Sequence, residues 1–399
     1  MTKFRSRKTA SAASSVKIVK AHEKWRLHEC LNLLASENRS SNAVRGMLSS
    51  DLSNRYTSPD QFYMGTRYID EVQTRTEELA KDLFRCDYAD VTPLSGHVAD
   101  VIVLSLLACR GDKIMAVAKE HGGYPGISPE GYPKIYGLHV TEFPFDNEKF
   151  NIDTTTAAAA IERVSPKIVV FGASFILFPH PLKELSETCH RIGAHVVYDG
   201  SHVLGLIAGG QFQDPLREGA DLLIGSTHKS FPGPQGGVVL TTKSKDMVRD
   251  KVNPAIVDNA HWNRIAALCV ALEEMKQFGT RYAKQVISNS QTLAKALDES
   301  GVKLLGKASG FTKSHQVIVN EDDPRKAARM ARRLEEANIL VDVGIRIGTS
   351  EETRLGMKEP EMHRIAELIS RVWVSNEHPS KVRNEVRKLR REFLTLKFC

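Results

Sequence analysis

The chain has 399 residues, of which 41% are hydrophobic and 26% charged, and its net charge is +7. This length supports one large unit and a smaller one, and no apolar run approaches the roughly 20 residues of a membrane-spanning helix, so we expect no membrane partner. The basic balance favours phosphate and carboxylate ligands and gives nucleic acid only weak support. The six cysteines form no CxxC pair and have no histidine at metal-binding spacing, which predicts reduced thiols, no metal and a cytoplasmic location.

The first 40 residues are predicted to form an N-terminal arm. Residues 1–15 are basic, rich in Ser and Ala, and free of acidic residues. This composition predicts a disordered tail, with an organelle transit peptide as the alternative. A helix is predicted from Ser15 to about Cys30.

Residues 41–250 are predicted to form a large α/β domain. Helices are expected from Asp70 to Phe84 and from Val98 to Ala108. Beyond them, strand-like and helix-like stretches alternate, which predicts a mostly parallel sheet covered by helices. The alternating stretches are Lys113–Val117, Leu138–Phe143, Thr154–Val164, Lys167–Gly172, Leu182–Ile192, His195–Tyr198, Asp221–Gly225 and Gly237–Thr241.

Residues 251–399 are predicted to form a smaller α+β domain. The expected helices are Ala266–Gln277, Ala283–Leu297 and Pro324–Ala337, and the expected strands are His315–Asn320 and Ile339–Val343. The basic segment 381–393 is interpreted as a solvated helix face, with RNA binding as the minor alternative.

Two of the predicted strands end in residues that can carry chemistry. Asp199 ends one strand, and Lys229 follows another in Gly225-Ser226-Thr227-His228-Lys229. The carboxyl ends of parallel strands meet at one sheet edge, where a desolvated lysine has a lowered pKa and a reactive amine. Pyridoxal phosphate needs such a lysine for its aldehyde and a carboxylate for its pyridine nitrogen. A surface lysine and a helix-capping aspartate remain the alternatives.

A third stretch predicts a phosphate site. Ser95-Gly96-His97 precedes a predicted helix, whose first backbone N–H groups are free to bind an anion at the positive end of the helix dipole. An ordinary helix cap has the same sequence, so this stretch is weak evidence by itself.

Together these motifs resemble the serine hydroxymethyltransferase family, most closely its archaeal branch. The resemblance covers roughly residues 20–375. It implies a fold-type I pyridoxal-phosphate transferase with a mostly parallel seven-stranded sheet, a small amino-acid substrate and a homodimer with shared active sites. The matching motifs are Leu34-Ala35-Ser36-Glu37-Asn38, Ser95-Gly96, His121-Gly122-Gly123, Asp199-Gly200-Ser201-His202, Gly225–Lys229, Gly233-Pro234-Gln235-Gly236-Gly237 and Gly344-Ile345-Arg346-Ile347-Gly348-Thr349.

The resemblance also implies roles for single residues. Lys229, Asp199, His121 and His202 would be catalytic, with His121 stacked on the cofactor ring and His202 beside the ring oxygen. The implied cofactor-binding residues are Ser95, Gly96, His97, His121, Ser174, Asp199, His202, His228, Lys229 and Tyr56. The implied substrate-binding residues are Ser36, Tyr56, Tyr63 and Arg346, the two tyrosines reaching across the dimer interface; a structural Asp or Glu partner is the alternative for Arg346.

The chain departs from the family pattern in three places. Ser58 stands where the family has a proton-shuttling glutamate, the segment 342–345 is shorter than the family loop that helps bind the pterin, and the segment 253–261 lacks a glycine after its proline. Two functions therefore stay open. One is hydroxymethyl transfer between serine and a reduced pterin (tetrahydrofolate or tetrahydromethanopterin). The other is a pterin-independent aldolase or another reaction at the α carbon, such as racemisation or transamination. A non-catalytic protein that binds pyridoxal phosphate or RNA is the alternative of another class.

Overall fold

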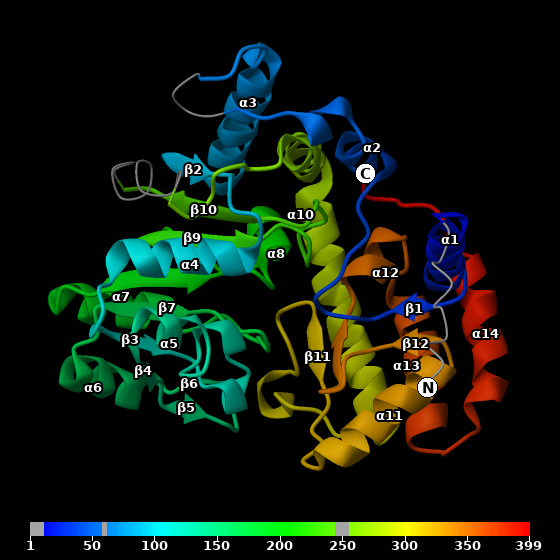
Figure 1. Ribbon diagram of the computed structural model, residues 1–399. Coiled ribbons are helices and arrows are strands. Elements are labelled where there is room, and N and C mark those ends of the chain that lie inside the picture. The colour runs from blue at the N-terminus through cyan, green and yellow to red at the C-terminus, as the bar shows by residue number, and fades with distance from the viewer. Residues whose placement is uncertain (1–11, 58–61, 244–254) are drawn as a thin grey trace, which may run out of the picture.

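A seven-stranded sheet forms the centre of the computed structural model, which describes residues 12–57, 62–243 and 255–399 (Figure 1). Its strand order is β2-β10-β9-β8-β7-β3-β4. The five strands from β9 to β4 are parallel, and β10 is antiparallel to both of its neighbours. The predicted α/β fold with a mostly parallel sheet is confirmed. The strands are β2 Tyr88–Asp90, β3 Lys113–Ala116, β4 His139–Glu142, β7 Ile168–Phe171, β8 His195–Asp199, β9 Leu222–Ser226 and β10 Gly237–Thr241.

Helices cover this sheet and bury its central strands. Every residue of β7, β9 and β10 is buried, as expected for Val/Ile/Leu-rich strands with both faces covered. Helix α4, Gly96–Leu107, packs across β9 and β10. Helix α7, Leu182–Arg191, packs against β8 and against α6, Thr154–Val164.

The longest helix was predicted as two. Helix α10 runs without interruption over Trp262–Glu299, a length of 38 residues, so the prediction of separate helices is wrong. Gly279, between the two predicted helices, lies against the short helix α8, Leu204–Ala208. A Cβ atom on Gly209, which follows α8, would lie 2.6 Å from the carbonyl oxygen of Gly279. Gly209 therefore allows the close approach of the two segments, and Gly279 continues the helix.

A second hydrophobic core lies beyond the middle of α10. It is built on two small sheets, in which β11 pairs with β13 and the N-terminal β1 pairs with β12. The pairing of β1 makes the N-terminal arm part of this unit. The elements are β1 Leu31–Asn32, β11 Gln316–Ile318, α11 Pro324–Glu336, β12 Ile339–Leu340, β13 Arg346–Gly348, α12 Ser350–Arg354, α13 Glu359–Trp373 and α14 Pro379–Arg391.

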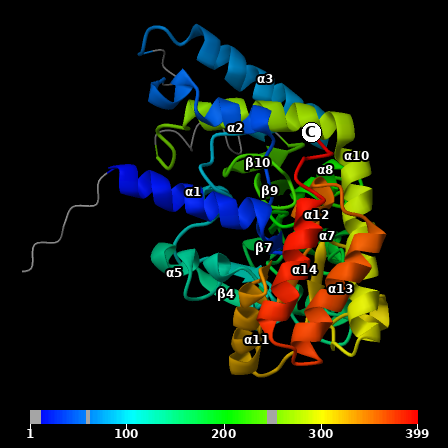
Figure 2. The ribbon, with the colours of Figure 1, turned by 90° about the vertical axis from the view of Figure 1, so that its right-hand side faces the viewer.

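The N-terminal helix α1, Ala12–His28, contacts α14 near its end. Figure 2 shows that its N-terminal end projects away from the rest of the chain. Residues 1–11 of the predicted tail and the predicted boundary at residue 250 lie outside the described residues. Among the helices that the structure does describe, none is both long and apolar enough to cross a bilayer. The other elements are η1 Asp51–Asn54, α2 Asn42–Leu48, α3 Arg67–Phe84, η2 Lys119–His121, η3 Pro125–Ile127, α5 Tyr132–Tyr136, β5 Phe145–Asp146, β6 Asn151–Ile152 and η5 Lys307–Ser309.

Candidate active site

Two adjacent strands carry the predicted aspartate and lysine to one region. Asp199 is the last residue of β8, and Lys229 lies in the turn after β9, the strand paired with β8. Asp199 is 7% exposed, and its Oδ1 accepts the N–H of Ser201 at 2.9 Å. Ser201 Oγ accepts the N–H of Ser226 at 3.0 Å. These bonds fix the two strand ends to each other.

The surroundings of Lys229 favour the neutral amine. Burial lowers the pKa of Lys229 below its ordinary value, and the charge of Arg346 lowers it further. Asp199 and Asp100 act in the opposite direction without cancelling this effect. A lysine in these surroundings supplies an unprotonated amine more readily than a surface lysine does.

The N-terminus of α4 fits closely against the same strand ends. Ser95 is its N-cap, and its hydroxyl accepts the N–H of Val98 at 3.1 Å. A Cβ atom on Gly96 would lie 2.1 Å from Ser226 Oγ, so only glycine fits there. His97 is exposed and contacts the Tyr124 hydroxyl at 3.1 Å through its Nδ1. The first N–H groups of α4 therefore begin beside the end of β9.

Arg346, at the start of β13, has an acidic partner within the chain. Its Nε donates to Asp342 at 3.0 Å, and Asp342 also accepts the backbone N–H of Arg346 at 2.9 Å. Its guanidinium lies 4.7 Å from the centroid of the Phe175 ring, and its Nη1 donates to the carbonyl of Ser174. The side chain of Arg346 is only 9% exposed. The structural partner considered as an alternative from the sequence is thus present.

A glutamine that the sequence analysis did not single out connects Arg346 to His202. Gln316 donates from Nε2 to His202 Nδ1 and to the Ser174 carbonyl, both at 3.1 Å, and accepts the N–H of Ile176 at 2.9 Å. Arg346 Nη1 lies 3.3 Å from His202 Nε2. Burial, with Lys229 and Arg346 nearby, lowers the pKa of His202 well below its ordinary value, so this imidazole is neutral.

The segment that contains Ser36 runs beside β13. Leu34 forms an isolated antiparallel bridge with Ile347, and the carbonyl of Ala35 lies 3.0 Å from His315 Nε2. The ring of His315 stacks on that of His202, with centroids 5.9 Å apart. Ser36 thus follows two residues that are tied to the neighbourhood of Arg346 and His202.

His121 lies next to this group but stacks on a protein side chain. Its ring is 4.5 Å from that of Phe145, with an interplanar angle of 6°. The N–H of Phe175 donates to the carbonyl of Gly122 at 3.0 Å, which ties the His121 loop to the segment after β7. His228, next to Lys229, has a buried Nδ1 without a partner among the described residues, and burial lowers the pKa of His228 to about 4.

Tyr56 and Tyr63 lie apart from this cluster, on the surface of the chain. They are 37% and 38% exposed, and their rings meet edge to face at 5.0 Å. The Tyr56 hydroxyl donates to the carboxylate of Asp258. The chain on its own does not bring the two tyrosines to Lys229. Ser58, Asn253 and Pro254, which mark two of the departures from the family pattern, lie outside the described residues.

Three further residues of the cluster were missed by the sequence analysis. They are Asp100 on α4, Gln316 on β11 and Asp342 before β13. Asp100 had a signal, because it is the single charged residue in the apolar helix Gly96–Leu107. Gln316 had no such signal in the sequence, because its partner His202 is 114 residues away. Asp342 had none either, because its bond to Arg346 depends on a local turn.

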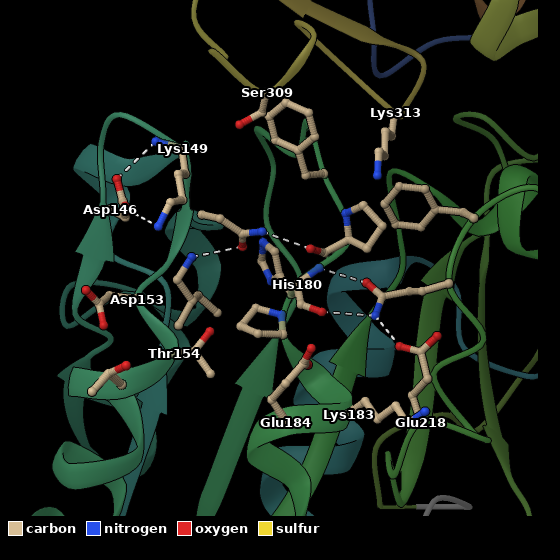
Figure 3. A pocket seen from close by; sticks show the side chains of 18 of the residues that line it. Asp146, Lys149, Asp153, Thr154, His180, Lys183, Glu184, Glu218, Ser309 and Lys313 are labelled. Atoms are coloured by element: carbon tan, nitrogen blue, oxygen red, sulfur yellow. Dashed lines mark hydrogen bonds and ion pairs between the residues drawn. The ribbon is translucent and has the colours of Figure 1, made fainter. Parts of the chain in front are cut away.

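A cavity of about 990 Å³ lies elsewhere, between the segments 146–155, 178–184 and 211–218 and the residues Ser309 and Lys313 (Figure 3). None of the cluster around Lys229 lines it. Its central polar groups bind one another: Gln213 accepts the N–H of His180 at 3.0 Å and donates to Glu218 at 2.6 Å. We therefore place the chemistry at the strand ends and not in this cavity.

A parallel sheet with a lysine and an aspartate on adjacent strand ends, and a helix N-terminus beside them, defines a fold-type I pyridoxal-phosphate enzyme. The family model for serine hydroxymethyltransferase matches residues 10–369, and the chain belongs to this family.

Known proteins agree with this assignment over nearly the whole chain. The serine hydroxymethyltransferase of Methanopyrus kandleri is 45% identical over 404 residues, covering 96% of this chain and 94% of its own. That of Pyrococcus abyssi is 44% identical over 400 residues, covering 94% and 93%. The crystal structure of an L-threonine transaldolase from Pseudomonas fluorescens superposes with a TM-score of 0.88 at 28% identity, covering 95% of this chain and 90% of that one.

Proposed function

We propose that the protein uses pyridoxal 5'-phosphate to break and form the Cα–Cβ bond of serine or a related β-hydroxy amino acid, with glycine as the second amino acid of the reaction. The observation that carries this proposal is the placement of Lys229 and Asp199 on paired strand ends, with the Arg346–His202 group beside them. When bound, the cofactor provides an electron sink at the substrate's α carbon.

The residues present fit this cofactor. Lys229 offers an amine with a lowered pKa, and Asp199 offers a buried carboxylate for the pyridine nitrogen. The N-terminus of α4, at Ser95, Gly96 and His97, offers N–H groups for the phosphate. Two buried polar atoms, Oδ1 of Asp100 and Nδ1 of His228, have no partner among the described residues, as expected where a polar ligand belongs.

We assign the remaining predicted roles around that position. We assign the His202 tautomer that accepts from Gln316 at Nδ1 and carries its proton on Nε2, so that Arg346 Nη1, 3.3 Å away, does not donate to it. Nε2 is then a donor towards the cofactor's ring oxygen, together with Ser174. His121 is assigned the role of stacking on the pyridine ring of the cofactor. Arg346 and Ser36 bind the substrate carboxylate, for which the Nη atoms of Arg346 are the available donors since Asp342 holds Nε.

The protein acts as a homodimer with shared active sites in this proposal. Tyr56 and Tyr63 are exposed beside Phe62, Met64 and Tyr68, which are 74%, 89% and 68% exposed, and such a patch suits a subunit interface. The exposed α1 arm would wrap on the partner. We propose the division 1–40, 41–250 and 251–399, in which the arm 1–40 packs on the C-terminal unit through β1. We also propose a cytoplasmic location, in keeping with six free cysteines.

Subunit mixing tests the shared site. A Lys229→Ala chain and a Tyr56→Phe chain should each be impaired, and a mixture refolded together should regain activity, because some hybrid dimers then contain one complete site. If the mixture has only the summed activity of the two variants, the sites are not shared.

A pterin-independent reaction is the second candidate, and one observation favours it. Only Asp342, Val343, Gly344 and Ile345 separate Val341 from Arg346, and Asp342 is bonded to that arginine. This segment leaves little chain for a pterin-binding loop. Racemisation or transamination at the α carbon would be consistent with the same site.

One assay separates these functions. The purified protein is incubated with pyridoxal phosphate and with L-serine or L-threonine, with and without tetrahydrofolate or tetrahydromethanopterin, and glycine is measured. Glycine formed only with a pterin identifies the hydroxymethyltransferase, and glycine formed without one identifies the aldolase. No glycine under any condition contradicts the proposed function.

A further inference from the structure

Asp100 is a buried carboxyl group that the reaction described above does not use. It lies on α4 among Ala99, Val101, Ile102 and Val103, and it is 2% exposed. Its Oδ1 has no hydrogen-bond partner in the described part of the chain. An unpartnered buried carboxyl oxygen costs stability, and the neighbours of Asp100 indicate what it could bind.

The helix geometry directs Asp100 towards the catalytic strand ends. Asp100 is four residues after Gly96 and therefore lies on the same face of α4, one turn further along. Gly96 faces Ser201 and Ser226, whose Oγ atoms would lie 3.0 and 2.1 Å from a Cβ at that position. These serines flank Asp199 and Lys229 in the sequence.

Two charged groups and one phenol, from three other segments, interact with Asp100. Asp199 on β8 and Lys229 after β9 both act on it, and Asp100 in turn acts on Tyr124, before η3. Burial raises the pKa of Asp100 well above its ordinary value, Asp199 raises it further, and Lys229 opposes both. Burial also raises the pKa of Tyr124 to about 12, so the phenol is neutral.

We propose that Asp100 is a positioning residue: a buried carboxyl group on α4 that faces the Asp199–Lys229 pair and, as the neutral acid, hydrogen-bonds within that group when the cofactor is bound. Two carboxylates in one buried pocket repel each other, which favours the neutral acid at Asp100, the one whose Oδ1 has no hydrogen-bond partner among the described residues. With Asp100 protonated, Asp199 is the one carboxylate charge that faces the pyridine nitrogen. This inference rests on the proposed function for the identity of the ligand.

Two substitutions separate a neutral acid from a carboxylate. Asp100→Asn keeps the shape and a donor but has no charge, whereas Asp100→Ala removes the polar group. For Asp100→Asn, the pH midpoint of the bound cofactor's absorbance should stay unchanged, and the cofactor dissociation constant should stay within about threefold of that of the unmodified protein. For Asp100→Ala, this constant should rise about tenfold, the loss expected for one hydrogen bond to a charged group.

The opposite pattern would overturn the proposal. If Asp100 were the carboxylate partner of Lys229, Asp100→Asn would move the absorbance midpoint to lower pH and weaken cofactor binding as much as Asp100→Ala does. If both variants bind the cofactor like the unmodified protein, Asp100 does not position anything. Asp90→Asn is the matched control, since Asp90 is a buried carboxyl on β2 that bonds Thr92, away from this pair.

Thermal unfolding gives a readout that does not need the cofactor to work. A carboxyl with a raised pKa in the folded chain holds a proton that the unfolded chain releases, so stability falls as pH rises above the ordinary carboxyl pKa. Asp100→Asn should therefore raise Tm at pH 8 by about 2 °C or more and leave it unchanged near pH 4. A lower Tm at pH 8 would show that the charged form stabilises the fold. If the protein binds no pyridoxal phosphate, the proposed function is contradicted. The Tm measurement still tests the protonation of Asp100, because it does not require the cofactor.

Discussion

Two regions of the molecule contain buried charged side chains, and in both some of the polar atoms have no hydrogen-bond partner among the described residues. The regions differ in what we propose for them, since one would bind a ligand and the other serves the fold. The first is the proposed active-site cluster of Asp100, Asp199, His202, Lys229 and Arg346. The second, which we call the arm cluster, joins the N-terminal arm to the C-terminal helices through Asn32, Glu351, Glu352, Arg354 and Arg390. Both contain buried side-chain atoms with no partner among the described residues.

The arm cluster is made of groups that serve the fold. Glu352 accepts the backbone N–H of Asn32 at 2.6 Å, and Glu351 accepts from its side chain at 2.8 Å. Arg354, fully buried, donates to Glu274 at 2.9 Å. The bonds of Asn32 connect segments more than 300 residues apart, and the bond of Arg354 connects residues 80 apart. Unpartnered atoms alone therefore do not identify an active site, and our proposal rests instead on Lys229 and Asp199 at paired strand ends.

The largest expected effect is from Lys229→Ala. Activity should fall by at least about a thousandfold, because no other residue supplies the covalent attachment of the cofactor. Borohydride treatment followed by peptide mass analysis should find the cofactor on residue 229 of the unmodified chain and on no peptide of the variant. Lys284→Ala, on the exposed face of α10, is the control and should retain both adduct and activity. An adduct that persists in Lys229→Ala would remove the basis for the comparison of the two regions.

Arg346→Ala should produce the next largest effect. Loss of a charged carboxylate partner should weaken the binding of glycine and serine about a hundredfold, with the cofactor still bound. The measurement is the change in cofactor absorbance during titration with each amino acid. Arg346→Lys keeps a positive charge but lacks the paired donors, so its affinity for the amino acids should lie between those of Arg346→Ala and the unmodified protein. Unchanged affinity would mean that Asp342 is the sole partner of Arg346, as in a structural ion pair.

The position of the strand ends can be predicted from the sequence, because the carboxyl ends of parallel strands meet at the same sheet edge in every fold of this kind. Asp199 and Lys229 each follow an apolar run, and parallel strands bring such ends together whatever the rest of the chain does. The side chains that orient the cluster could not be predicted in this way. Gln316 reaches His202 from 114 residues away, across the two cores, and a buried glutamine has the same appearance in the sequence as an exposed one.

The errors in the fold prediction have a similar cause. Gly279 carries the same local signal whether it ends a helix or lies inside one, and the sequence around it does not decide between them. In the structure it lies inside α10, where Gly209 packs against it. Asp342 lies in a short loop, where an acidic residue is ordinary, and its bond to Arg346 depends on the turn at Ile345, whose φ is +51°.

Arg354→Met tests whether the arm cluster serves stability alone. Removing one member of a buried ion pair leaves Glu274, whose side chain is 11% exposed, without its partner, at a cost of about 3 kcal/mol in the free energy of unfolding. Denaturant unfolding measures this loss, and the cofactor dissociation constant of the folded variant should not change. Glu274→Gln with Arg354→Met restores neutrality and should recover part of the stability. Weaker cofactor binding in the folded variant would link the two regions.

The smallest effect is expected from Glu352→Gln, and its sign follows from the proton that the folded chain retains. Burial raises the pKa of Glu352 to about 8, above its ordinary value, so the folded chain holds a proton that the unfolded chain loses. Between the ordinary carboxyl pKa and pH 8 the unfolded state binds fewer protons, and stability falls as pH rises. Glutamine removes this dependence while its amide oxygen still accepts the N–H of Asn32, so Tm should rise by about 2 °C at pH 8 and stay the same at pH 4. The absorbance of the bound cofactor should titrate as in the unmodified protein, since the arm cluster has no role in the chemistry. A shifted titration would show that its charge is felt at Lys229, and the separation of the two regions would then be wrong.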